Sequence, residues 1–464
     1  MERQKKIHLL WRAGFGPDIP TLAHIEHTTI DNLWKIIKAN SQKSLNPIIS
    51  QSSFVKDNYN KSTDSSLSKN EKEEFNRSLR QQSAKDLRQM NAFWIDNMVN
   101  STNQLGEKMS FFWHHHFAIR HNNSFLQEEA INIIRKYALG SFKDLLREVS
   151  KSGAMILSLN NQQNRKSSPN ENFAREIMEL FSMGIGTYTE KDIKEAARSF
   201  TGWSINRKGY FTFRGEQHDT GKKQFLGKTG NFDGDDIIDI ILDQPQTATF
   251  IVSKVYRFLV HDKIDAKKID RLASIFRKDY NILNLLESIF TADWFYNEQF
   301  IGSRIKTPIE LIVGARRCSP VMDMEDNLQY NIQKLLGQIL FYPPSIAGWP
   351  MEKNWIDNST LLVRIQFPFM MSGQRKNNFK AKADDDVDMG MTNNQRENLA
   401  SNKNTVFNPN WSDWVKNRTI KEIAQYLLAK HSSAEGIEII ASQQFTDKTP
   451  AIYGIMGLPE YQLC

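Results

Sequence analysis

Helical periodicity is the feature that most constrains the fold of this chain. Apolar side chains recur at Leu87, Met90, Phe93, Trp94 and Met98, close to the 3.6-residue period of an α-helix. Similar patterns cover further segments, namely 105–117, 128–139, 142–150, 189–203, 235–242, 247–260, 267–278 and 282–291. No stretch alternates strands with helices as a parallel sheet requires. The sequence therefore predicts a mainly α, multi-helix globular protein.

Residues 204–230 depart from this helical pattern. Residues 210–213 alternate as Tyr-Phe-Thr-Phe, a turn follows at 214–216, and residues 224–227 could return beside them. Alternation bounded by turn residues is typical of a β-hairpin. We therefore predict one small β-ribbon within the helical fold.

Two segments, 41–83 and 373–406, are rich in polar residues and carry few apolar anchors. Such a composition buries too little apolar surface to offset the entropy of ordering. We predict two polar, partly disordered insertions, of which the first could instead form a helical hairpin arm. The main helical domain would then span 1–372, followed by a disordered loop at 373–406 and a C-terminal helical segment, 407–464, packed on that domain.

The charge balance and the cysteines exclude several classes of protein. The chain has 60 basic and 53 acidic residues among 464, a net charge of +7, and no dense run of lysine and arginine. This mild excess argues against nucleic acid as a partner. Its two cysteines, Cys318 and Cys464, cannot form a disulfide framework.

The segment that follows Met1–Lys6 lacks the apolar stretch of a secretion signal. No run approaches the length of about 18 apolar residues that a membrane span needs. We expect a soluble chain without a transmembrane segment, placed in the cytoplasm by the absence of a signal peptide, with export to the periplasm as the open alternative.

Three consecutive histidines, His114, His115 and His116, stand between aromatic residues. Imidazole binds metals and titrates near neutral pH, so this cluster is a candidate for chemistry. If the helix continues through them, they point in three directions and cannot share one metal ion. If the helix ends near Trp113, His114 and His116 share one side of an extended segment. The structural alternative is a buried histidine bonded to a backbone carbonyl.

A second polar cluster begins with His218 and Asp219 and continues to Gly221, on a loop that flanks the predicted ribbon. A histidine and an aspartate on one loop could complete a metal site, or form a base with the group that orients it. The structural alternative is a turn in which Asp219 bonds its own backbone.

A third candidate is the pair of carboxylates Glu171 and Glu176. Ser168 and Glu171 have the spacing of a capping box at a helix start, and Arg175 lies where it could pair with Glu171. Glu176 and Glu179 are neighbours on one helical face. Such carboxylates can serve acid/base chemistry, although most are simply solvated.

Seven ordered phrases together give the chain a resemblance to a known family. They are HLLWRAGFG (8–16), KMSFFWHHHFA (108–118), NENFARE with ELF (170–181), EAAR with TGW (195–203), HDTGKK (218–223), KTPIEL (306–311) and FYPPSIAGWP (341–350). In these phrases the chain resembles the bacterial family catalogued as domain of unknown function 1800, which is uncharacterised.

The resemblance implies little chemistry. It implies export by a twin-arginine signal, which this chain does not show, and a sulfatase-like genomic neighbour. The family usually has asparagine where this chain has His115, so the resemblance favours His114 and His116 as the shared residues.

Two hypotheses of function follow. The first is a hydrolase-like enzyme, either metal-dependent or using acid/base chemistry, whose site joins the two histidine clusters. A divalent Zn, Mn or Fe ion would then activate a water molecule. The proposed metal ligands are His114, His116, His218 and Asp219, and Glu171 or Glu176 would add a catalytic carboxylate. The second hypothesis is a non-enzymatic helical scaffold that binds a partner protein such as the sulfatase-like neighbour.

Overall fold

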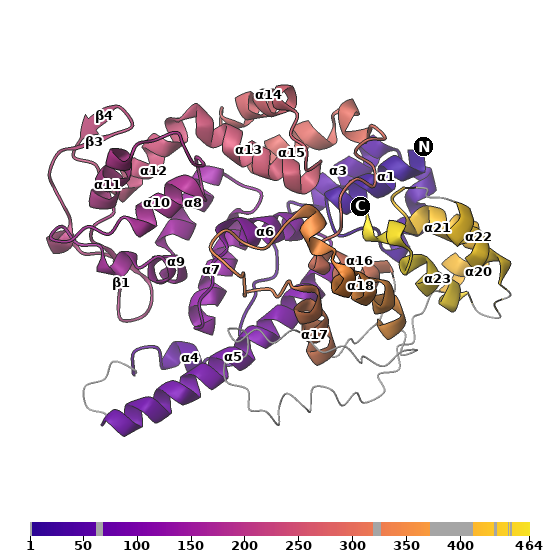
Figure 1. The fold of residues 1–464 in the computed structure, drawn as a ribbon, viewed down its shortest axis with the longest axis horizontal. Helices are drawn as coiled ribbons and strands as arrows, with labels where there is room; N and C mark the ends of the chain where they lie inside the picture. Colours follow the sequence, from indigo (N-terminus) through magenta and orange to yellow (C-terminus); the bar gives the residue numbers. More distant parts are fainter. Residues whose placement is uncertain are drawn as a thin grey trace.

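The structure is a computed structural model that describes residues 2–61, 68–318, 326–371, 412–430, 434–443, 445 and 448–464. Over these residues the chain is mostly helical, and its strands form two small two-stranded sheets (Figure 1). The prediction of a mainly α protein is confirmed. In the part of the chain that the structure describes, no helix is long and apolar enough to cross a membrane.

The first half of the chain supplies helices that spread across the molecule from one edge to the other (Figure 1). They are α1 (Glu2–Arg12), α2 (Ile19–His24), η1 (Ile25–His27), α3 (Ile30–Asn40), α4 (Phe54–Asp57), α5 (Lys69–Asn100), α6 (Gln104–Phe117), α7 (Ser124–Tyr137), α8 (Phe142–Lys151), α9 (Gly153–Ser158), η3 (Asn161–Gln163), α10 (Asn172–Glu179) and α11 (Glu190–Ser199). Helix α6 is buried on nearly every side, because aromatic residues occupy most of its last two turns.

The polar segment 41–83 contributes a helical arm, as the second of the two expectations for it predicts. Ser68 and Glu71 form a capping box that starts the 32-residue helix α5. The buried residues of α5 begin at Ser83, so its first turns extend away from the core, with α4 beside them (Figure 1). Residues 62–67 lie outside the described residues.

The β-structure of residues 203–230 is two hairpins rather than the single one expected. Strand β1 (Trp203–Ile205) pairs with β2 (Phe211–Phe213), and β3 (Lys223–Phe225) pairs with β4 (Lys228–Gly230), both antiparallel. Leu226 and Gly227 join the second pair and have φ angles of 45° and 81°. Two positive φ angles match the twist of a two-residue hairpin turn. The alternation at 210–213 was therefore correct, but its partner is the preceding strand.

The remaining helices complete the body of the molecule and end in a C-terminal group. They are η4 (Gly215–Gln217), α12 (Gly234–Asp243), α13 (Pro245–Leu259), α14 (Ala266–Phe276), α15 (Ile282–Phe290), η5 (Asp293–Tyr296), α16 (Pro308–Cys318), α17 (Asp326–Leu336), η6 (Glu352–Trp355), α18 (Asn358–Met371), α20 (Ser412–Lys416), α21 (Ile420–Leu427), α22 (Ala434–Ser442), α23 (Thr449–Met456) and η7 (Pro459–Gln462). The loop predicted at 373–406 lies outside the described residues.

The C-terminal helices pack against the N-terminal helix. The guanidinium of Arg3 on α1 lies 4.5 Å from the ring centre of Tyr426 on α21, whose hydroxyl donates to Glu26 at 2.5 Å. Further along, Ile305 and Leu463 form an isolated antiparallel bridge. The end of the described chain therefore lies beside residues 304–306, which form one wall of the pocket described below.

Candidate functional site

The three histidines stand in the last two turns of an unbroken helix. Helix α6 continues to Phe117 and stops where Ala118 adopts a left-handed conformation and donates its N–H to the His114 carbonyl. The imidazoles therefore point in three directions, as the helical alternative predicts.

Two of these histidines hold one loop, which we call the pocket loop and which spans residues 341–356. The Nε2 atom of His114 accepts the Phe341 N–H at 3.1 Å, and the Nδ1 atom of His115 accepts the Trp349 N–H at 3.3 Å. Gly348 has a φ of 88°, and a Cβ atom there would lie 2.6 Å from the His115 carbonyl oxygen. Only glycine allows this close approach. His114 and His115 thus hold the pocket loop at Phe341 and at Trp349.

The third histidine points elsewhere. His116 donates from Nε2 to the Phe181 carbonyl at 3.1 Å and is surrounded by the rings of Phe112 and Phe117. Burial lowers the pKa of all three histidines, with His114 at about 3 and His115 at about 4. All three rings are therefore neutral at neutral pH, because burial disfavours the charged form.

A pocket opens between α6, α13, residues 303–307 and the pocket loop. The lining residues are Phe111, His115, Arg257, Phe258, Asp262, Ser303, Arg304, Ile305, Thr307, Gln338, Pro350, Met351, Glu352, Lys353 and Trp355. His115 is the member of the triplet that reaches this space, and it is also the only one of the three that is not fully buried.

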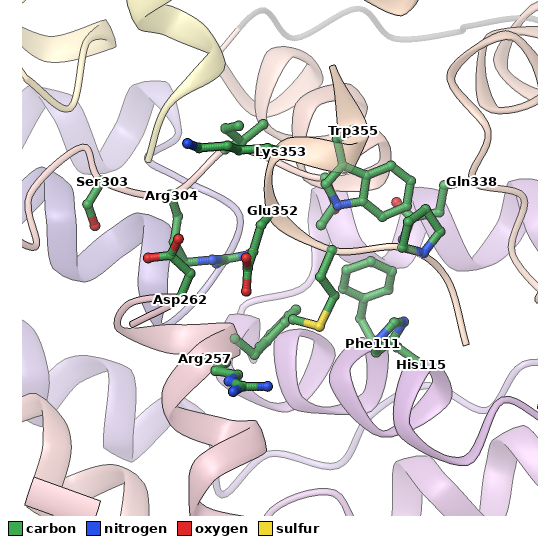
Figure 2. Close-up of a pocket in the computed structure, with 15 residues that line it drawn as sticks. Phe111, His115, Arg257, Asp262, Ser303, Arg304, Gln338, Glu352, Lys353 and Trp355 are labelled. Atoms are coloured by element: carbon green, nitrogen blue, oxygen red, sulfur yellow. The ribbon is translucent and has the colours of Figure 1, made fainter. Parts of the chain in front are cut away.

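The pocket has a charged side and an aromatic side. Figure 2 shows Asp262, Arg304 and Glu352 gathered on one side, and Phe111, His115 and Trp355 on the other. Arg257 lies below them, on α13. This division suits a ligand with a polar head and a flat apolar part.

Behind the charged side lies a buried ion network centred on Glu310. Its carboxylate is fully buried and accepts from Lys108 at 2.5 Å, from Arg304 at 3.4 Å and from the Thr307 N–H at 2.8 Å. Burial alone would raise the pKa of Glu310, but Arg304 and Lys108 hold it well below its usual range. The network thus keeps Arg304 in place at the pocket wall.

Lys306, next to the pocket wall, is enclosed by two aromatic rings. Its Nζ atom lies 3.7 Å from the ring centres of both Trp11 and Tyr461, and it donates to the Tyr461 carbonyl at 2.5 Å. Burial lowers the pKa of Lys306 to about 7. Cation–π contacts of this kind offset part of the cost of burying the ammonium group, but burial still lowers its pKa.

Glu352 has the most unusual backbone in the pocket. Its φ is 61°, a left-handed conformation that costs a non-glycine residue about 1–3 kcal/mol. The Glu352 side chain contributes to raising the pKa of Arg304, so the two charges face each other. Strain of this size persists only where the surroundings impose it, and it clusters at functional sites.

The second histidine cluster is engaged in a different part of the molecule. His218 lies 2.8 Å from the Thr201 carbonyl through Nδ1, and Asp219 forms a two-point ion pair with Arg198, at 2.7 Å from its Nε. Asp219 also accepts the Gly221 N–H at 2.8 Å, as the turn interpretation predicts. Figure 1 shows the β-strands that flank this loop at the edge of the molecule and α6 at its centre.

The acidic candidates also have other partners. The predicted capping box of Ser168 and Glu171 is wrong: Glu171 itself occupies the N-cap of α10 and makes no capping bond, because the helix starts at Asn172. Arg175 does pair with Glu171 at 3.3 Å, as the spacing predicts, and it also pairs with Glu179. Burial raises the pKa of Glu176, with a further rise from Glu179.

Among the described residues, no three histidine, cysteine, aspartate or glutamate side chains are grouped so that they could hold a metal ion. The four predicted ligands, His114, His116, His218 and Asp219, therefore do not form such a group. Binding of Zn, Mn or Fe stays a prediction that metal analysis has to test.

Sequence reasoning missed most of the pocket residues. Arg257, Asp262 and Glu352 belong to no catalytic motif, and they meet only through the folding of α13 and the pocket loop. One signal was available: the phrases at 8–16, 108–118, 306–311 and 341–350 supply Arg12, Lys108, Lys306, Glu310 and the pocket loop. Charged residues inside otherwise apolar phrases indicate a buried ion network.

The structure is that of a mainly α protein with a charged pocket beside its central helix, α6. The family model described as protein of unknown function (DUF1800) matches residues 8–463, and the chain belongs to this family. A search of curated proteins and a search of solved structures each found no match.

Proposed function

We propose that this protein is an acid/base enzyme that binds a small anionic substrate in the pocket beside α6. The observation that carries the proposal is the charge balance of the pocket. Three cationic side chains, Arg257, Arg304 and Lys353, line it against two carboxylates, Asp262 and Glu352. Such an excess attracts anions.

The charged side chains buried behind the pocket wall are also mostly basic. Lys108, Lys306 and Arg12 are buried there, and both Glu310 and Cys464 oppose their charge by raising the pKa of Arg12 and Lys306. The Arg12 side chain donates to the Phe300 and Cys464 carbonyls and to the Ser303 hydroxyl, but its Nε and one terminal nitrogen have no partner in the described structure.

Arg257 and Lys353 are the groups that would bind the substrate anion. Both are exposed at the pocket, and neither makes an ion pair with any described residue. Arg304, by contrast, is committed to Glu310. A guanidinium binds carboxylate, phosphate or sulfate through two parallel N–H bonds, which would orient the anion.

His115 would act as a neutral hydrogen-bond donor. Its Nδ1 accepts the Trp349 N–H, so a neutral ring carries its proton on Nε2. With a pKa of about 4, the ring stays neutral at pH 7. A neutral imidazole held in this way can polarise a carbonyl or stabilise a developing oxyanion.

Glu352 would act as the general base. Its carboxylate points into the pocket, and its backbone is held in a strained conformation (Figure 2). Asp262 is less suited to this role because it already contacts Nδ1 of His261 at 2.7 Å. General base catalysis by a positioned carboxylate contributes about 10²–10⁴-fold to a rate.

The test is a binding and turnover screen with matched probes. Thermal shift at constant ionic strength would compare benzoate, phenyl phosphate and phenyl sulfate with the neutral benzyl alcohol. We expect at least one aryl anion to stabilise the protein, and Arg257→Gln to weaken its binding about tenfold, while the exposed Arg271→Gln has no effect. Equal effects of the neutral and anionic probes would overturn the proposal.

For turnover, p-nitrophenyl phosphate, sulfate and acetate would each be tested with the wild type and with Glu352→Gln. The variant should bind the aryl anion normally but lose about 10²–10⁴-fold in rate on the probe that the wild type turns over. A variant that turns over at the wild-type rate would exclude Glu352 as the base.

A further inference from the structure

A second hollow, which we call the arm groove, runs between the helical arm and the first β-hairpin. Its lining residues are Tyr59, Asn60, Asn76, Leu79, Arg80, Ser83, His121, Asn122, Asn123, Ile205, Asn206, Arg207 and Arg214. None of these residues lines the pocket beside α6.

The arm groove is cationic without compensation from its own lining. Arg80, Arg207 and Arg214 line it, and no carboxylate does so within the described part of the chain. Arg80 and Arg207 are exposed, and Arg214 is held by a bond to the Ile205 carbonyl at 3.2 Å. Three guanidiniums from two separate elements, α5 and the β1–β2 hairpin, thus face one space that suits an anionic ligand.

The rest of the lining is rich in amides. Five asparagines line the groove. The side-chain oxygens of Asn123 and Asn206 already accept backbone N–H groups, and their NH₂ groups are hydrogen-bond donors. His121 accepts the Asn123 N–H through Nδ1 at 3.1 Å, so a neutral ring presents an N–H at Nε2. Burial lowers the pKa of His121 to about 4, which keeps that ring neutral. Amides and neutral N–H groups match hydroxyl groups, which also donate and accept.

One aromatic ring completes the groove. Tyr59 is half-buried and packs edge-on against Phe125 with ring centres 5.9 Å apart. An amphipathic ring of this kind can pack against the flat face of a sugar. Binding of single-stranded nucleic acid would need several rings on which successive bases stack, and the described lining has only this tyrosine and a histidine.

We propose that the arm groove binds an acidic oligosaccharide, whose carboxylate or sulfate groups pair with Arg80, Arg207 and Arg214 while its hydroxyls bond the asparagines. Carboxylate and sulfate groups would bind in the same way, because a guanidinium group can donate two parallel N–H bonds to either of them. The site is independent of the function proposed for the pocket beside α6.

Calorimetric titration of the whole chain at low salt tests this assignment. The probes are trigalacturonate, sulfated maltotriose and unmodified maltotriose. We expect one or both acidic probes to bind at least about tenfold more tightly than maltotriose, and the tighter one identifies the acid group. Equal affinity for maltotriose, or no binding of either acidic probe at about 10 mM, would overturn the proposal.

Variants locate the binding. Arg80→Gln with Arg207→Gln should weaken the acidic probe by about tenfold or more. The control, Arg77→Gln with Arg271→Gln, removes the same charge from exposed positions outside the groove and should stay within about twofold. An equal loss of affinity in both double variants would mean that net charge alone attracts the probe, and it would overturn the proposed binding site. Tighter binding of oligo(dT) than of either acidic sugar would also overturn it, in favour of nucleic acid.

Discussion

The pocket beside α6 and the arm groove both present arginine to a hollow, but they differ in what lies behind the charge. In the pocket, Arg304 is fixed by Glu310, and Glu310 is in turn shared with Lys108. In the arm groove, Arg80 and Arg207 stand on the surface with water around them. A buried network holds a charge in one geometry, whereas surface arginines adapt to the ligand. The pocket therefore has one fixed arginine beside the exposed Arg257 and Lys353, whereas the groove has no arginine held by a buried carboxylate of the described chain.

The largest expected difference concerns Glu310. Glu310→Ala leaves Lys108 and Arg304 buried without their carboxylate, and we expect it to lower the free energy of unfolding by about 3–5 kcal/mol. Urea denaturation measures the change. The control Glu287→Ala breaks only the surface pair with Lys38 and should cost about 0–1 kcal/mol. A loss at Glu310 no larger than the control's would contradict the buried network.

The next largest effect separates the two histidine clusters. His114→Ala leaves the buried Phe341 N–H without an acceptor, which costs about 1–3 kcal/mol and frees one end of the pocket loop. We expect the variant to lose both stability and aryl-anion binding. His218→Ala removes the bond to the Thr201 carbonyl and should lower stability while binding in the pocket stays unchanged. Impaired anion binding in His218→Ala would show that the two clusters are coupled.

The pH dependence of stability gives a smaller signal. His115 titrates at about 4 in the folded chain against 6.5 in the unfolded one. Between these values the unfolded state binds more protons, so stability is full above pH 6.5 and falls as the pH drops towards 4. Glu129, whose pKa burial raises to about 7, acts in the opposite direction. The melting temperature of His115→Asn should therefore fall less between pH 7 and pH 4.5 than that of the wild type. Parallel curves would mean that His115 is not buried as described.

The smallest effect is expected in the arm groove. Because Arg80 and Arg207 are exposed, their replacement by glutamine should change the free energy of unfolding by no more than about 0.5 kcal/mol. Urea denaturation under the conditions used for Glu310→Ala makes the comparison direct. A loss above about 2 kcal/mol would show that these arginines support the fold.

The metal prediction has its own test. Because a metal-binding histidine commonly bonds a backbone carbonyl through its second ring nitrogen, the bonds of His116 and His218 leave the prediction open. Less than one equivalent of Zn, Mn or Fe in the purified protein, in His116→Ala and in His218→Ala alike would remove the metal prediction. Elemental analysis measures the metal content. A full equivalent in the wild type that is lost in both variants would support the shared metal site. Binding of a sulfatase-like partner likewise stays a prediction, which a pull-down would test.

The helices were predictable because their signals are local. Apolar period and start residues placed most of them, and Asp233 caps α12 through its side chain as its type favours. Register and pairing were harder: residues 211–213 were recognised as a strand, but whether they pair forwards or backwards depends on the turns at 206–210 and 226–227. The helical geometry of the histidine triplet correctly separated its members.

The pocket could not be predicted, because its residues come from distant segments. His115 was ranked below its neighbours, since a family pattern says which residue is shared and not which one reaches a cavity. Asp262 and Glu352 lie in polar surroundings where carboxylates are ordinary. Their meeting depends on the packing of α13 against the pocket loop, which no local pattern encodes.

The central claim is that an anion binds among Arg257, Arg304 and Lys353. A crystal structure of the protein with phenylphosphonate, a probe that cannot be hydrolysed, tests it most directly. We predict the phosphonate within hydrogen-bonding distance of the Arg257 guanidinium, with its ring against Trp355 and Phe111. Phenylphosphonate bound only elsewhere, or a pocket that stays free of it at saturating concentration, would contradict the account.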